Sequence, residues 1–117
     1  MKSTILACLL ALAPVAIAET AAKSGDNSFS SKSHHAMTAM DQKMRDMKMS
    51  GDAGTDFAAM MIPHHQAAID MAKAYLESGK DSDLRRMAEK MVSDQEKEVK
   101  QLQAWLDKNG KKSAQTH

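Results

Sequence analysis

Apolar side chains recur every three or four residues along three segments of this 117-residue chain. The most regular segment runs from Leu84 to Leu106, with steps of 4, 3, 4, 4, 3 and 4 if Gln95 is counted among the apolar positions. This spacing is that of one face of an α-helix. Asp81 or Ser82 is suitably placed to cap its first turn. The pattern therefore predicts a long amphipathic helix in the last third of the chain.

A second helix is predicted to begin at Thr55 or Asp56 and to end at Ser78 and Gly79. Pro63 lies inside this segment. A proline removes one backbone donor and clashes with the preceding turn, so the helix either bends there or restarts with the proline in its first turn. The sequence leaves both alternatives open.

The first helix is predicted from Ser33 onward, because four methionines follow at steps of 3, 4 and 3 before the small residues 50–54 interrupt the pattern. Asn109 and Gly110 are expected to end the third helix. Residues 33–109 thus form one all-α domain, an antiparallel three- or four-helix bundle, and residues 110–117 form a tail. The first helix is too short to cover the other two, which favours a homo-oligomer.

The N-terminal residues 1–18 have the features of a signal peptide, with a basic start, an uncharged apolar run and Ala16-Ile17-Ala18 before Glu19. Residues 19–32 are small and polar and are expected to be disordered. Removal of 18 residues takes away Cys8 and leaves 15 Lys and Arg against 15 Asp and Glu. A neutral chain with few aromatic residues is unsuited to nucleic acid, and it has no membrane span after processing.

Methionine is strongly over-represented, with 11 residues in the chain. Met60-Met61-Ile62-Pro63-His64-His65 is the most unusual run. Residues three or four apart share a helix face, so Met60 and Met71 lie on the side of His64, and Met61 lies on the side of His65. Each histidine therefore has a thioether within reach along its own helix.

Thioether sulfur and imidazole nitrogen together select soft monovalent ions, so the expected ligand is Cu(I), with Ag(I) as a second. Thioethers need no deprotonation and cannot form disulfides, which suits an exported protein. The predicted main site is His64, His65, Met60, Met61 and Met71. The first helix offers a second, more flexible set or an entry path, made of His34, His35, Met37, Met40, Met44 and Met47.

Other interpretations of these residues remain open. Methionines at helical spacing commonly fill a core, and this is the favoured role for Met87 and Met91, which could otherwise supply the opposite wall of the metal site. Gln95 falls among apolar positions, where a hydrogen bond to a histidine of the second helix would satisfy it. A metal-free module whose adaptable methionine face grips a partner helix is the competing function. Motifs of zinc proteases, di-iron bundles, cysteine or serine nucleophiles and phosphate loops are absent from the sequence, so no enzyme activity is expected.

The run from Asp56 through the Met60–His65 motif to Met71-Ala72, with a closing helix carrying Gln95, Glu98 and Trp105, resembles an exported bacterial family described as domain of unknown function family 305. The resemblance covers residues 33–109. It implies a ferritin-like helical bundle, and it implies copper binding and copper tolerance in the periplasm, because the family includes CopM-type copper-binding proteins. It also implies that Met60, Met61, His64, His65 and Met71 are candidate ligands and that other copper-handling proteins of the envelope are partners.

Overall fold

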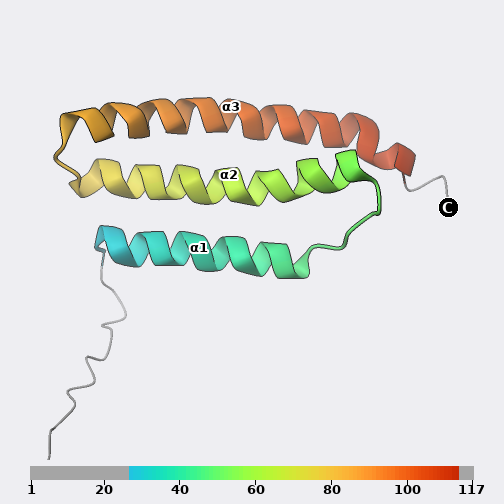
Figure 1. The fold of residues 1–117 in the computed structure, drawn as a ribbon, viewed down its shortest axis with the longest axis horizontal. Coiled ribbons are helices and arrows are strands. Elements are labelled where there is room, and N and C mark those ends of the chain that lie inside the picture. Colours follow the sequence, from blue (N-terminus) through green and yellow to red (C-terminus); the bar gives the residue numbers. More distant parts are fainter. Residues whose placement is uncertain (1–26, 114–117) are drawn as a thin grey trace, which may run out of the picture.

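The computed structural model describes residues 27–113, which form three α-helices joined by short loops (Figure 1). These are α1 (Phe29–Asp46), α2 (Ala53–Ser78) and α3 (Ser82–Ser113). The all-α helical bundle predicted from the periodicity is confirmed. The predicted signal peptide, residues 19–26 of the predicted leader and the last four residues lie outside the described range.

The three helices lie side by side in a single layer, with α2 in the centre (Figure 1). Successive helices run antiparallel, and α2 packs against both α1 and α3. Within residues 27–113, α1 and α3 do not pack against each other. The domain is therefore an open layer, and each helix leaves part of its surface without a neighbour.

The α1 helix begins at Phe29, four residues before the predicted start. Its N-cap is Ser28, whose hydroxyl accepts a hydrogen bond from the Ser31 N–H at 3.2 Å. The Phe29 ring packs edge-on against Tyr75 of α2, with ring centroids 6.0 Å apart. Periodicity did not predict this start, because the cap is one of several serines in the same stretch and the partner of Phe29 lies in another helix.

The N-cap of α2 is Asp52, three residues before the earlier of the two predicted caps, so the helix begins at Ala53. Its carboxylate accepts a hydrogen bond from the Thr55 N–H at 2.8 Å. Asp56 turns back instead and accepts hydrogen bonds from the Ser50 N–H and hydroxyl, both at 2.7 Å. Gly51, with φ of 84°, supplies the left-handed turn directly before Asp52, and its N–H donates to the Asp56 carboxylate at 3.1 Å.

Pro63 lies within α2, which runs from Ala53 to Ser78 as one helix. The alternative in which the helix restarts at Pro63 is therefore wrong. The proline ring is buried, among the alanines on the side of α2 that faces α1. A continuous helix keeps the residues before and after Pro63 in one helical register, which matters for the motif around His64.

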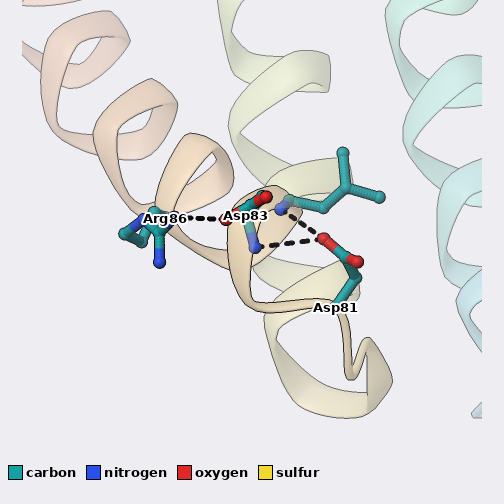
Figure 2. Close-up of polar contacts among 4 residues, drawn as sticks. Asp81, Asp83 and Arg86 are labelled. Carbon is teal, nitrogen blue, oxygen red and sulfur yellow. Dashed lines mark hydrogen bonds and ion pairs between the residues drawn. The ribbon is translucent and has the colours of Figure 1, made fainter.

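The α3 helix is capped by Asp81, as one of the two predicted caps (Figure 2). Its carboxylate accepts hydrogen bonds from the N–H groups of Asp83 at 3.0 Å and Leu84 at 2.9 Å. The predicted end at Asn109 and Gly110 is wrong, because the helix continues to Ser113. The Asn109 side chain donates to the Trp105 carbonyl oxygen at 2.9 Å and thus supports the helix rather than ending it.

The interior of the described domain is built almost entirely from alanine. Ile69 is the largest side chain that is fully buried. The other buried apolar residues are Pro63 and the alanines Ala36, Ala58, Ala67, Ala72, Ala74 and Ala88. Small side chains let the helices approach closely, but they remove little apolar surface from water. The large apolar side chains must therefore lie elsewhere.

The two sides of the layer differ in chemistry. Ion pairs bridge one side, where Lys32 of α1 meets Glu77 of α2 and Lys73 meets Glu96 of α3. At 100° per residue, the opposite side of each helix carries large apolar groups. We call that side the open face, and its exposed residues are Met37, Phe57, Leu84, Met87, Met91 and Trp105, each 40–61% exposed. No helix among the described residues is long and apolar enough to cross a membrane.

Candidate metal centre

His65 of α2 is held by two hydrogen bonds at the boundary between α2 and α3. Its Nδ1 lies 2.9 Å from the carbonyl oxygen of Met61, one turn earlier in the same helix. Its Nε2 lies 2.5 Å from the carboxylate of Glu98 on α3. The imidazole is 14% exposed, whereas the Glu98 side chain is 53% exposed. The ring is thus fixed at the floor of a groove, and its carboxylate partner lies at the rim.

Both nitrogens of His65 are occupied in this arrangement. A carbonyl oxygen only accepts, so Nδ1 carries a hydrogen and donates it to Met61. The remaining nitrogen, Nε2, is covered by Glu98. A metal ion therefore reaches His65 only when Nε2 gives up any hydrogen that it shares with Glu98 and the carboxylate moves away, and the exposure of Glu98 leaves it free to do so.

Two hollows meet at His65 and Glu98, and thioethers line both. The first, of about 520 Å³, lies toward the start of α2 and contains Met61 together with Phe57 and Trp105. The second, of about 410 Å³, lies along α3 and contains Met87 and Met91. The expectation that Met61 and His65 share one face is met by this groove.

Met87 and Met91 are exposed to 60% and 41%, so the favoured interpretation of them as core residues is wrong. They lie on the outer edge of the apolar stripe of α3, where they join His65 at the second hollow. The fold thus brings the thioethers of Met87 and Met91 to the same hollow as His65 of α2. Spacing along a single helix cannot predict a meeting of residues from two helices.

The expected hydrogen bond between Gln95 and a histidine of α2 is also wrong. Gln95 is half-buried and lines the second hollow, but it forms no hydrogen bond with any residue of the described range. Glu98 takes that place instead. A signal for this was present, because Met91, Glu98 and Trp105 follow one another at seven-residue steps and so share a stripe of α3.

His64 differs from His65 in being exposed, and its ring forms no hydrogen bond with the described part of the chain. Met60 and Met71 are half-buried and project from the same side of α2 as His64. This is the arrangement expected from their spacing. His64 is therefore an imidazole with both nitrogens available, flanked along its helix by two thioethers.

The methionines of α1 lie beside this part of α2. Two contacts set the register of the antiparallel pair, Phe29 with Tyr75 at one end and Ser50 with Asp56 at the other. Continuing that register places Met40 level with His64 and Met44 level with Met61. Met37 is exposed, and the remaining methionines of the stripe are half-buried, namely Met40, Met44 and Met47. Met47 lies just beyond the helix, as its C-cap.

The two histidines of α1 do not lie with these methionines. His35 lines a pocket of about 490 Å³ on the ion-paired side of the layer, together with Asp70, Lys73 and Glu77. His34 is exposed, and its backbone carbonyl accepts a hydrogen bond from the Thr38 hydroxyl at 2.9 Å. The structure thus brings the methionines of the predicted second set toward His64 and directs His35 elsewhere.

Within residues 27–113, no three His, Asp or Glu side chains converge into a group that could hold a metal ion. The donors that accompany His64 and His65 are therefore thioether sulfurs and the Glu98 carboxylate.

The charged side chains near the groove form oppositely charged pairs. A hydrogen bond from Lys90 lowers the pKa of Asp94, and the same contact raises the pKa of Lys90. Lys73 likewise lowers the pKa of Glu96 across the α2–α3 boundary.

Fold and donor set together define a class, a small all-helical protein with a methionine-rich open face that carries a histidine pair. A family model described as "Domain of unknown function (DUF305)" matches residues 11–106. The protein therefore belongs to the DUF305 family, as the motif around His64 and His65 predicted. A search of curated proteins finds no match. Copper binding, which the resemblance to CopM-type members implied, stays a prediction for this chain.

Proposed function

We propose that this protein binds Cu(I), and also Ag(I), in the periplasm, where it sequesters the ion or passes it on by ligand exchange. The observation that carries the proposal is the pairing of imidazole and thioether on the open face. His64 lies on the side of Met60 and Met71, and His65 shares its groove with Met61, Met87 and Met91. Neither arrangement offers the carboxylate cluster that a hard cation needs.

The donor chemistry supports a soft ion. Thioethers bind Cu(I) and Ag(I) without losing a proton, so the sulfur donors of the site keep their affinity at acidic pH, where thiolate and imidazole ligands are weakened by protonation. Methionine in place of cysteine also avoids disulfide formation in an oxidising compartment. The signal-peptide features of residues 1–18 support the same location, because processing after Ala18 removes the single cysteine, Cys8.

His64 and His65 have different roles in this proposal. His64 is the entry ligand, because its nitrogens are free and its side chain is exposed. Met60, Met71 and the methionines of α1 supply sulfur on the same side of α2. His65 is the retaining ligand, reached after the Glu98 carboxylate releases Nε2. Transfer between the two requires successive replacement of one soft ligand by another and displacement of Glu98 from Nε2 of His65.

The test is the joint replacement of Met60, Met61 and Met71 by leucine. This exchange nearly conserves side-chain volume and costs less than about 1.5 kcal/mol per site, so the fold survives. Under the proposal, Cu(I) affinity measured against a competing chelator falls by at least roughly a hundredfold, or about 2.8 kcal/mol. Met49→Leu, in the loop between α1 and α2, is the control and leaves the affinity unchanged.

A metal-free interaction module is the second candidate, and it is favoured by the exposure of Phe57, Leu84 and Trp105, which carry no metal donor. The same titration separates the two functions. Unchanged Cu(I) affinity in the triple leucine variant overturns the copper proposal and assigns the methionines to packing and partner contact. Measured copper content of the protein from copper-fed cells gives an independent answer, since a metal-free module carries none.

A further inference from the structure

We propose that the groove between α2 and α3 binds a second copy of this chain, with α3 packed antiparallel against α3 of the partner. The proposal does not depend on copper binding. It rests on the contrast between an alanine interior and a set of large apolar side chains left outside it. A domain normally needs two packed layers to bury its apolar surface, and this one supplies a single layer.

The exposed apolar area reaches the size of a small specific interface. Five side chains on this part of the open face are 40–61% exposed, namely Phe57, Leu84, Met87, Met91 and Trp105. With about 200 Å² for each large side chain, they amount to roughly 500 Å² per copy and about 1,000 Å² for the pair. That area meets the lower limit for a specific interface before any neighbouring residue is counted.

The face is complementary to itself, as a two-fold interface requires. Leu84 and Met87 project near the start of α3, whereas the larger hollow lies near its end, lined by Phe57, Leu102 and Trp105. Leu84 and Trp105 are equally distant along α3 from the peptide bond between Asp94 and Gln95. A two-fold axis at that point seats the Leu84 end of each helix in the Trp105 end of the other.

The charges along the same edge of α3 fit this pairing. Lys90 forms an ion pair with Asp94 of its own chain, and Glu98 lies one turn further on. In the antiparallel arrangement, Lys90 of one copy faces the turn that carries Glu98 in the partner. A face of one sign would repel its copy, whereas this edge carries both signs in a balanced order.

The test is the oligomeric state of the protein in solution, measured by sedimentation equilibrium over a wide range of concentrations. The wild type is expected to be a dimer, and Met87→Glu is expected to weaken dimerisation at least roughly tenfold, because it introduces an unpaired charge into an apolar contact. Met49→Glu is the matched control. Both methionines are 60% exposed, but Met49 lies in the loop before α2, so its substitution leaves the dimer intact.

A symmetric cross-link tests the register. With Cys8 replaced by serine, Asp94→Cys places a thiol beside the proposed axis, and mild oxidation is expected to give a disulfide-linked dimer. Asp41→Cys, on the exposed side of α1, gives none. A protein that stays monomeric at every concentration overturns the proposal. So does a dimer that Met87→Glu leaves at wild-type strength, or one that cross-links through position 41 and not through position 94.

Discussion

Glu98 of α3 lies 2.5 Å from Nε2 of His65 on α2, and this contact joins the two longest helices at the candidate metal centre. This pair favours the stability of the fold and opposes metal binding. It stabilises the packing of α2 against α3, and it covers the one nitrogen of His65 through which a metal ion can approach. Stability and metal binding therefore compete for the same atom.

Removing the Glu98 carboxylate is expected to separate these effects. In Glu98→Ala the free energy of unfolding falls by about 0.5–1 kcal/mol, a small amount because Glu98 is half exposed. Cu(I) affinity rises by up to about fivefold, because Nε2 is no longer covered. Urea unfolding and a chelator titration measure the two quantities. Glu89→Ala, at an exposed position of the same helix, changes neither. A loss of affinity in Glu98→Ala would instead make the carboxylate a metal ligand.

The two histidines are expected to respond differently to alanine. His64 is exposed and forms no hydrogen bond among the described residues, so His64→Ala leaves the free energy of unfolding within about 0.5 kcal/mol of wild type. His65→Ala loses the contacts to Met61 and Glu98 and costs about 1–2 kcal/mol. Both variants lower Cu(I) affinity. Chemical denaturation with and without the metal checks the pattern, and equal stability losses would contradict the assignment of roles.

Periodicity predicted the three helices and the pairing of Met61 with His65, because both depend on neighbours within one helix. It missed the start of α1, which depends on Phe29 meeting Tyr75 of another helix. It also assigned the histidine contact to Gln95 rather than Glu98. Those two residues are three apart on α3, and only the rotation of α3 against α2 decides which one meets His65.

Which methionines are buried and which are exposed also depends on how the helices are rotated against one another. Spacing placed four of them on one stripe of α1, and the structure leaves Met37 exposed and the other three half-buried. Spacing could not show that Met87 and Met91 stay exposed, because an alanine interior leaves large side chains without a buried position. Nor could it direct His35 to the ion-paired side of the layer, beside Asp70 and Glu77.

The loop between α1 and α2 predicts how stability depends on acid. A hydrogen bond from the Thr55 backbone lowers the pKa of Asp52, and one from the Ser50 backbone lowers the pKa of Asp56. A carboxylate with a depressed pKa in the folded state stabilises the fold above its unfolded value, near pH 4 for a free Asp. That stabilisation is lost as the pH falls through the folded value.

The melting temperature is therefore expected to drop on acidification from about pH 6 to about pH 3, and Asp56→Asn reduces the size of that drop. The amide keeps the shape of the side chain but does not titrate. Circular dichroism melts at a series of pH values measure the effect. Asp41→Asn is the control, because its carboxylate forms no hydrogen bond among residues 27–113. An acid dependence that Asp56→Asn leaves unchanged assigns the effect to other carboxylates.

Ile69 is the position where a small change should damage the fold most. It is the largest fully buried side chain of the described domain, and the other buried aliphatic side chains there are alanines. Ile69→Ala leaves a cavity that the neighbouring alanines cannot fill, so the expected cost is about 2–5 kcal/mol, a large share of the stability of a domain of this size. Ile69→Val costs about 0.5–1.5 kcal/mol and serves as the graded comparison. Denaturant unfolding measures both. If Ile69→Ala is as mild as Ile69→Val, the interior described here is not what holds α2 in place, and stability then comes from the ion-paired edges or from a partner on the open face.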